Sequence, residues 1–373
     1  MTAAFDPQKL RRTATARHAC GLFAAAYDPV SQRVVAGGVD GRLVAWDPAR
    51  WAEPPVAFHW QHRSYVYAVA ALPAQQQVVS AGYDRRLVWW DPLSGSPLRE
   101  AELPARPQQL AVAPDGRTLA VVDDDRTLRL FDAATGAPTA SYADHPQYTP
   151  KMHLSTVYAV AYSPDGRWLA TGDRCGSIVV RAADSGTVVR RLHAPRFYGD
   201  FSRKPDGQPN DGEYELGGVR MLAFSPDGSL VVAGGMGDYN PNSAGTDGKM
   251  GLTGFDTATG EERFSVLLAK DQGYLQTAQF HASGLLVAAG GGGTGGDTGV
   301  GALCVLDPAR PDAPTTHSLE MTVRSVLLLP DERGAVVVGM HKKAAEGQLE
   351  HWQTADAAAE PSADAAAEPS ADG

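Results

Sequence analysis

The sequence predicts an all-β fold, a seven-bladed β-propeller, and three observations support this prediction. First, an aromatic residue followed by Asp recurs at Trp46-Asp47, Trp90-Asp91 and Phe131-Asp132, with steps of 44 and 41 residues between the aspartates. Second, each unit holds short apolar or alternating runs that are typical of strands. Third, Pro-Asp-Gly and related turns separate these runs. A period of about 40 to 45 residues with four strands per unit is typical of propeller blades.

Seven copies of the unit can be counted, although they keep the pattern to different degrees. The fourth copy lacks both the turn Asp and the aromatic residue, and the step from Asp132 to the matching Ala182 is 50 residues. The next step, to Asp256, is 74 residues, so the second half of the chain carries insertions. The copies end at Trp46-Asp47, Trp90-Asp91, Phe131-Asp132, Arg181-Ala182, Phe255-Asp256, Leu306-Asp307 and Trp352.

The second copy shows the strands expected in one blade. Its runs cover residues 66–71, 77–81 and 87–90, and a fourth run follows the Trp90-Asp91 pair. In the turns between such runs, Pro fixes φ and Gly tolerates a positive φ, which favours tight reversals of the chain. We therefore expect four antiparallel strands in each blade.

The two ends of the chain are predicted to share a blade. The last copy has no fourth strand of its own, because its third strand runs directly into low-complexity sequence. Residues 9–16 resemble an outer strand, and we expect them to pair with residues 348–353 and so remove an exposed sheet edge. The expected organisation is a flexible N-terminus (1–8), one propeller domain (9–353) and a disordered acidic Ala/Pro/Ser tail (354–373).

A recurring set of polar residues resembles the stabilising network of the WD-repeat, or G-beta-like, propeller family over about residues 9–353, as in a divergent member of bacterial type. The resemblance implies that a His before the first strand, a hydroxyl in the second, a turn Asp and a Trp in the third are linked, since buried polar groups need partners. The full set is His62, Ser80, Asp84 and Trp90; copy one has His18, Asp40 and Trp46 with Ala36 in place of the hydroxyl, and copy four has His153 and Thr171 but neither Asp nor Trp.

Composition limits the classes of partner. The net charge is −10, and five acidic residues of the tail supply half of it. Nucleic acid is not expected as the main partner, because phosphate binding needs a basic stripe. The sequence has no signal-peptide-like segment and no apolar run of about 18 residues, so we expect a cytoplasmic protein that does not enter membranes. The three cysteines, Cys20, Cys175 and Cys304, lack metal-ligand spacing and are expected to be reduced.

The insertions are expected to gather on one face of the ring. In a propeller, the loops between blades and those between second and third strands emerge on the same side. Loops longer than about 12 residues are uncommon in compact domains and often functional. The sequence therefore predicts a face of added loops over blades four to seven, formed by residues 144–152, 194–217, 235–251, 290–301 and 341–347.

The insertion at 194–214 is the richest in Arg and aromatic residues, which are common anchors of protein interfaces. The alternative is that its aromatic residues pin the loop to the ring. We regard both interpretations as open. The candidate partner-binding residues on this face are Arg196, Phe197, Tyr198, Asp200, Phe201, Tyr239, Asn240 and Asn242.

No motif in the chain predicts a cofactor or a metal. The loop from Asp238 to Asp247 starts like a calcium loop, but Ser243 and Lys249 stand where an EF-hand needs Gly and Glu. An irregular calcium site shared with Asp211 or Glu213 is the alternative to a turn-rich polar loop. The pattern Gly-x-Gly-x-x-Gly occurs at Gly291, Gly293 and Gly296. It lies between two strands of a blade rather than before a helix, so it does not predict a dinucleotide site.

We expect a non-enzymatic scaffold, a monomeric ring that presents its inserted-loop face to a protein partner, as the family resemblance implies. No catalytic residue is assigned, because the repeat explains the histidines and no nucleophile elbow occurs. The alternative is a propeller enzyme, or a ligand- or metal-binding protein, with its site at the channel mouth. That alternative requires convergence of several carboxylates in one pocket, from Asp200, Asp211, Glu213, Asp238 and Asp247.

Overall fold

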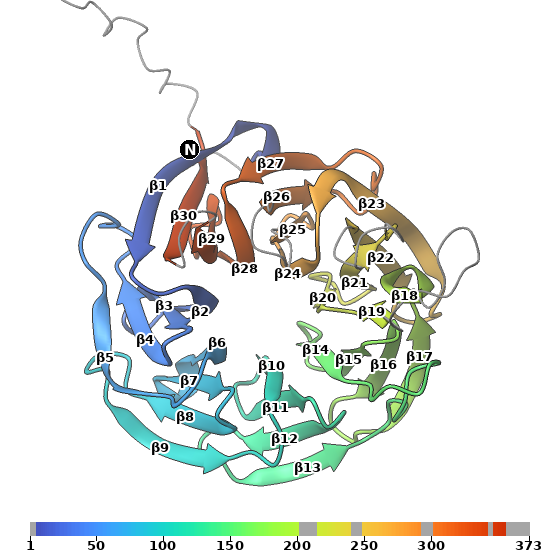
Figure 1. The fold of residues 1–373 in the computed structure, drawn as a ribbon, viewed down its shortest axis with the longest axis horizontal. Coiled ribbons are helices and arrows are strands. Elements are labelled where there is room, and N and C mark those ends of the chain that lie inside the picture. Colours follow the sequence, from blue (N-terminus) through green and yellow to red (C-terminus); the bar gives the residue numbers. More distant parts are fainter. Residues whose placement is uncertain (1–4, 201–214, 240–247, 292–300, 342–345, 356–373) are drawn as a thin grey trace, which may run out of the picture.

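The structure is a computed structural model that describes residues 5–200, 215–239, 248–291, 301–341 and 346–355. Seven four-stranded antiparallel sheets stand around a central channel, as the sequence predicts (Figure 1). In each sheet the first strand lies at the channel and the fourth lies at the rim. The fold is therefore a seven-bladed β-propeller.

The strands of blades one to four follow one another along the chain in the order of the sheet. Blade one contains β2 (Leu22–Asp28), β3 (Arg33–Gly38), β4 (Arg42–Trp46) and β5 (Val56–Gln61). Blade two contains β6 (Val66–Leu72), β7 (Gln77–Gly82), β8 (Arg86–Trp90) and β9 (Pro97–Glu102). Blade three contains β10 (Pro107–Val112), β11 (Thr118–Asp123), β12 (Leu128–Asp132) and β13 (Pro138–Tyr142). Blade four contains β14 (Val157–Tyr162), β15 (Trp168–Asp173), β16 (Ser177–Ala182) and β17 (Val188–His193).

The later blades follow the same order, with one added hairpin. Blade five contains β20 (Met221–Phe224), β21 (Leu230–Gly237), β22 (Lys249–Asp256) and β23 (Glu262–Gln272). Blade six contains β24 (Leu275–Phe280), β25 (Leu286–Gly291), β26 (Gly301–Leu306) and β27 (Thr315–Leu319). Blade seven contains β28 (Met321–Leu328), β29 (Gly334–His341) and β30 (Gly347–Thr354). The added hairpin is β18 (Tyr198–Asp200) with β19 (Glu215–Gly217), and the 3-10 turns are η1 (Pro7–Lys9), η2 (Pro73–Gln75) and η3 (Pro195–Phe197).

The ring closes through its N-terminal strand, and this prediction is confirmed. Strand β1 (Leu10–His18) is the outer strand of blade seven and pairs with β30 from Leu10↔Thr354 to His18↔Gly347. The carboxylate of Glu350 on β30 is completely buried and accepts hydrogen bonds from Arg12 on β1 and from Gln348 and Trp352 on its own strand. Since a buried charge needs partners, this contact supports the closure of the ring.

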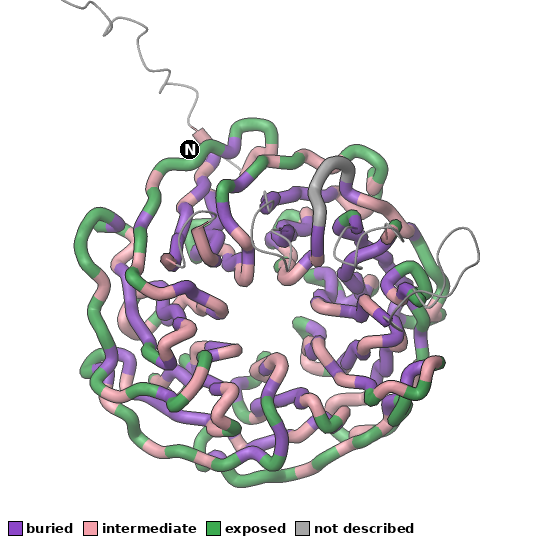
Figure 2. The backbone as a smooth tube through the Cα atoms, in the orientation of Figure 1, coloured by how far each residue is buried: buried purple, intermediate pink, exposed green. Residues whose placement is uncertain are grey.

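The core lies between neighbouring blades. Second and third strands are almost continuously buried, as in β7 and β8, whereas the outer strand β9 is largely exposed. Figure 2 shows the same contrast around the ring, with exposed residues at the rim. The adjacent Trp89 and Trp90 point to opposite sides of their sheet, because side chains alternate along a strand. Trp89 packs between blades two and three and Trp90 between blades one and two, so one dipeptide joins three blades.

Candidate functional site

One face of the ring carries both the interblade loops and the loops between second and third strands. In blade two, Tyr83 follows the second strand and donates its N–H to the carbonyl of Tyr65, which precedes the first strand, at 2.8 Å. Matching bonds occur in blade one (Val39 to Gly21, 2.9 Å) and blade four (Arg174 to Thr156, 2.9 Å). We call this side of the ring the loop face.

Blade two contains one chain of hydrogen bonds beneath the loop face. Trp90 Nε1 donates to Ser80 Oγ at 2.9 Å, Ser80 Oγ lies 2.8 Å from His62 Nε2, and His62 Nδ1 lies 3.0 Å from the carboxylate of Asp84. Burial alone would raise the pKa of Asp84, but its bonds from His62 and from backbone amides outweigh burial and lower that pKa. The four residues with the family pattern are thus joined in space, and each has a partner.

Blade four has the same kind of network, but His153, the histidine expected from the sequence, is not part of it. His145 occupies the position, with Nε2 at 2.8 Å from Thr171 Oγ1 and Nδ1 at 3.0 Å from Asp173. The acid was not missing either: Asp173 ends the second strand, where blade two has Gly82. An insertion separates His145 from the first strand, so the spacing seen in blade two pointed to His153 instead.

His153 belongs to a second polar centre, built around the buried carboxylate of Glu215 on β19. His153 Nδ1 lies 2.8 Å from one carboxylate oxygen of Glu215, and the backbone N–H of Lys151 donates to the other at 3.0 Å. The hydroxyls of Thr149 and Tyr198 also donate to this carboxylate. Three of these donors, Thr149, Lys151 and His153, fasten the added hairpin to the loop between blades three and four, and Tyr198 joins its two strands.

The charge of Glu215 follows from these contacts. Burial would raise its pKa, but the hydrogen bonds from Thr149, Tyr198, Lys151 N–H and His153 lower the pKa below its ordinary value. Burial and the neighbouring carboxylate of Glu215 raise the pKa of Tyr198, so its hydroxyl keeps its proton. Lys151 also bonds Asp200 at 3.2 Å. The hairpin is therefore held by an ionised acid at its base.

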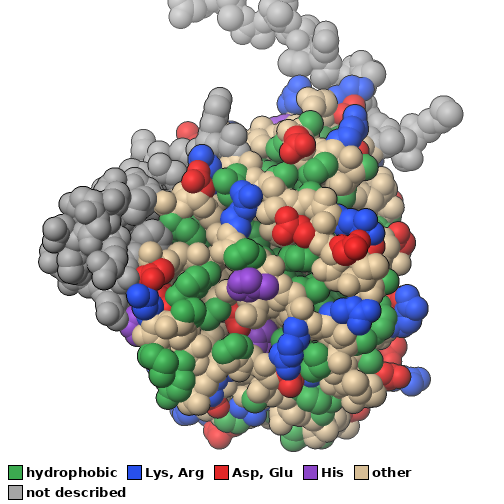
Figure 3. Space-filling view, turned by 90° about the vertical axis from the view of Figure 1, so that its right-hand side faces the viewer, with side chains coloured by type: hydrophobic (Ala, Val, Ile, Leu, Met, Phe, Trp, Pro, Cys, Tyr) green, Lys and Arg blue, Asp and Glu red, His purple; other side chains and the backbone are tan. Residues whose placement is uncertain are grey.

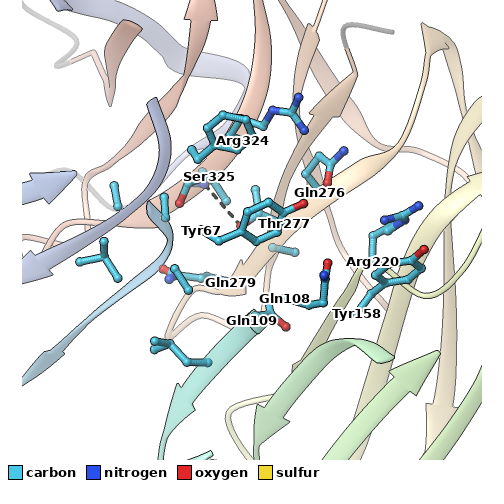
Figure 4. A pocket seen from close by; sticks show the side chains of 18 residues that line it. Tyr67, Gln108, Gln109, Tyr158, Arg220, Gln276, Thr277, Gln279, Arg324 and Ser325 are labelled. Carbon is cyan, nitrogen blue, oxygen red and sulfur yellow. Dashed lines mark hydrogen bonds between the residues drawn. The ribbon is translucent and has the colours of Figure 1, made fainter. Parts of the chain in front are cut away.

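A ring of seven side chains lines the channel just inside the loop face. In five blades the register shifts at the second residue of the first strand, and in blade seven it shifts at the fourth, Arg324. Bulged residues of this kind leave the ladder of the sheet. In blade five the matching residue precedes β20. Each ring residue is half-buried and follows a buried one. The bulge ring consists of Phe23, Tyr67, Gln108, Tyr158, Arg220, Gln276 and Arg324 (Figure 4).

An aromatic cluster joins this channel to the loop face over blades one and two. Phe23 stacks on Tyr65 and Tyr67, with ring centroids 5.7 and 5.8 Å apart. The ring centroid of Tyr83 lies 6.3 Å from that of Tyr65 and 6.0 Å from that of Tyr67. Arg106 lies over Tyr83 at 4.6 Å and donates to its hydroxyl. Tyr65 is 46% exposed, so the cluster reaches the surface.

Comparisons with known proteins identify the repeat. The family model "WD domain, G-beta repeat" matches residues 54–91, 108–132 and 144–180, which end with the third strands of blades two, three and four. The chain is a WD-repeat propeller. It is 31% identical over 121 residues to the guanine nucleotide-binding protein subunit beta of Zea mays, which covers 32% of this chain and 27% of that protein. It is 30% identical over 134 residues to Protein hir-1 of Neurospora crassa, which covers 34% of this chain and 12% of that protein.

These alignments span less than a third of either relative. WD40 propellers generally act as non-enzymatic scaffolds that bind other proteins. The similarity of this WD-repeat propeller to the two relatives therefore extends over part of each relative and not over its whole length.

The predicted partner-binding residues of the WD-repeat propeller have different surroundings. Phe197 is fully buried between blades four and five, so its side chain pins the inserted loop to the ring. Tyr198 donates to Glu215, and Tyr239 donates to the backbone carbonyl of Phe197 at 3.1 Å. Arg196 and Asp200 are exposed. Phe201, Asn240 and Asn242 lie outside the described residues.

The two described carboxylates that a propeller enzyme could use, those of Asp200 and Asp238, do not converge in one pocket. Asp200 pairs with Lys151 at 3.2 Å and Asp238 with Lys249 at 2.6 Å, and neither lines the channel. Asp211, Glu213 and Asp247 fall outside the described residues. Among the described residues, no group of three or more His, Cys, Asp or Glu side chains could hold a metal ion. Over the same residues, no helix is long and apolar enough to cross a membrane.

Sequence reasoning missed the bulge ring and the Glu215 centre. The ring had a usable signal, since each member follows an apolar residue near the start of the first strand, as in Val66-Tyr67 and Val157-Tyr158. Glu215 had none, because its four donors come from segments 17 to 66 residues away in the chain.

Proposed function

We propose that this WD-repeat propeller is a non-enzymatic scaffold that binds a protein partner on its loop face. The observation that carries the proposal is the placement of exposed apolar side chains. Four of the seven large apolar side chains that are exposed in the described chain lie on this face: Tyr65 (46%), Tyr148 (42%), Met152 (69%) and Leu154 (60%). Aromatic and Met side chains are enriched in protein interfaces.

The rest of the described surface offers less for a partner. Val56, Leu93 and Leu98, the other three exposed apolar residues, belong to outer strands or to the turn beside one. Across the rim on the side of β17 and β23, side chains of both charges are mixed with small apolar areas (Figure 3). A mixed rim suits a solvated surface, whereas grouped apolar residues suit an interface.

The insertions over blades four to seven extend the proposed interface. Tyr148, Met152 and Leu154 belong to the added loop before blade four, which Glu215 ties to the hairpin before blade five. A bridge between Tyr148 and Leu154 fixes the shape of that loop. A surface held in one conformation loses less entropy on binding, which favours affinity.

The test compares two variants with equal numbers of apolar residues removed. The loop-face variant replaces Tyr65, Met152 and Leu154 by Ser; the rim variant replaces Val56, Leu93 and Leu98 by Ser. Partners recovered with the intact protein are identified and their affinities measured. The loop-face variant should weaken binding by about tenfold or more, as for removal of interface anchors, while the rim variant binds normally. Equal affinities of both variants would contradict the proposal.

A further inference from the structure

Two arginines of the bulge ring carry positive charge into the channel. Arg220 lies between Tyr158 and Tyr274, at 3.7 and 4.6 Å from their ring centroids, and Arg324 lies 4.7 Å from the centroid of Phe23. Figure 4 shows both side chains on the channel wall, with Gln276 between them in this view. The channel therefore holds two cations near its opening on the loop face.

Among the described residues that line this cavity, none is acidic. The cavity at this point is lined by eighteen described residues, and Arg220 and Arg324 are the charged members among them. The ion pairs among the described residues include neither arginine. The buried Arg181, by contrast, bonds the carboxylate of Asp144 at 2.9 Å. A positive cavity in a chain of net charge −10 therefore needs an explanation.

The surroundings stabilise the two cations only in part. Contacts with aromatic faces offset only part of the free energy that is needed to take an ion out of water. Nε of each arginine is buried and has no hydrogen-bond partner among the described residues. Burial and the nearby Arg220 lower the pKa of Arg324, whereas Tyr158 and Tyr274 raise the pKa of Arg220 despite its burial. The two like charges oppose each other in one cavity. An anion between them would remove this opposition.

The size of the cavity limits what can enter. Its volume is about 220 Å³, below the roughly 300 to 1,000 Å³ that is usual for sites of free small molecules. It opens toward the aromatic cluster, where the proposed partner would lie. Gln108, Gln276 and the hydroxyl of Tyr67 can add hydrogen bonds to a group held at the centre. These dimensions suit one side chain of a larger ligand.

We propose that the bulge ring is an anion-recognition site, in which Arg220 and Arg324 bind a carboxylate or phosphate monoester on a side chain of the docked protein partner. The proposal rests on the proposed function, because the partner places that side chain. Guanidinium groups pair with such oxyanions through two parallel hydrogen bonds. The aromatic cluster then contacts the apolar residues that flank the anion.

The experiment uses three short peptides that are identical except at the central residue, which is Glu, phosphoserine or Gln. Binding is measured by calorimetry at low ionic strength, where charge pairs are least screened. At least one anionic peptide should bind with Kd of about 1 mM or tighter and about tenfold tighter than the Gln peptide. The carboxylate and phosphate arms show which anion is preferred. Acetate and inorganic phosphate, tested alone, should bind more weakly than the matching peptide.

Three variants assign any binding to the channel. Arg220→Gln and Arg324→Gln should each reduce the preference for the anionic peptide about tenfold. Arg106→Gln is the matched control, since this arginine also lies over a tyrosine of the loop face but outside the cavity. The two channel variants are independent, so misfolding of one leaves the other decisive. The same measurements on a chain that ends at Ala355 exclude the acidic tail as a competitor for the two arginines.

Other results would overturn the proposal. They are equal binding of all three peptides, binding that Arg106→Gln weakens as much as the channel variants do, or free anions that bind as tightly as the peptides. Absence of measurable binding of every anionic probe would also overturn it. None of these results bears on the loop-face variants above, because partner binding through the apolar residues is measured separately.

Discussion

The imidazole Nδ1 of His153 lies 2.8 Å from the carboxylate of Glu215, and this contact joins two insertions that are 62 residues apart in the chain. One insertion leads into blade four and the other into blade five. Their connection turns two separate loops into one surface beside the channel. The shape of the proposed interface therefore depends on the ionisation of one buried acid.

Replacing that acid should loosen the hairpin and change the response to pH. Glu215→Gln should lower the free energy of unfolding by about 1 to 3 kcal/mol at neutral pH, because its donors lose an anionic acceptor. The pKa of Glu215 is lowered in the folded protein, so its contribution is present above the ordinary value of 4.5 and is lost as pH falls through the folded pKa. Urea unfolding measured from neutral to acidic pH should show a smaller acid-induced loss in the variant.

Glu100→Gln is the control for that experiment, since Glu100 is 52% exposed and pairs with Arg86 on the rim. It should change stability by less than about 0.5 kcal/mol. If Glu215→Gln has the same acid sensitivity as the intact protein, the role given to Glu215 is wrong.

The two histidines of the blade-four region should differ in their effect on stability. His145→Ala leaves Thr171 and Asp173 buried without their ring partner, which should cost about 1 to 3 kcal/mol. His153 is 39% exposed on its side chain, and His153→Ala should cost about 1 kcal/mol or less. Urea unfolding of both variants measures the difference. A larger loss for His153 would support the assignment made from spacing alone.

Closure of the ring should depend on the inward face of β1. Leu10 is completely buried against Trp352 and its neighbours, so Leu10→Ala should lower the free energy of unfolding by about 2 to 5 kcal/mol. Arg11 is exposed on the same strand, and Arg11→Ala should stay within about 0.5 kcal/mol. Thermal and urea unfolding measure both. Similar losses for the two variants would argue against closure by this strand.

The three cysteines form no disulfide with one another in the described structure and should react with a chromogenic disulfide reagent to different extents. Cys304 is fully buried, and burial with nearby acids raises the pKa of Cys175 to about 11, so neither should react in the folded protein at about pH 8. Cys20 is partly exposed and should account for all native reactivity, which Cys20→Ser would remove. Denaturant should release three equivalents. Rapid native reaction of Cys175 would contradict its place in blade four.

Much of the fold could be predicted because its determinants are local. The turns and the aromatic-Asp pairs set the period, and the missing fourth strand of the last copy predicted its pairing with the N-terminal strand. The same locality led to the error at His153. A short insertion moved the true network residue, His145, away from its strand, and no local pattern records such a shift.

The sequence predicts a face of loops, whose role as a binding site stays a prediction, but it does not predict which side chains meet there. Insertion length located the loops, yet Phe197 proved to be a packing residue although its type suits an interface. The charge of the channel depends on Arg220 and Arg324, which are 104 residues apart in the sequence and meet only because the ring places blades five and seven around one axis. Contacts of this kind follow from closure of the fold.

The most direct test of the account is a hydrogen-exchange comparison of the protein with and without a bound partner. If the partner binds the loop face, exchange should slow at residues 65–67, 83–85 and 148–154, with little change in the outer strands β9 and β13. Protection confined to outer strands, with the loop face unchanged, would contradict it.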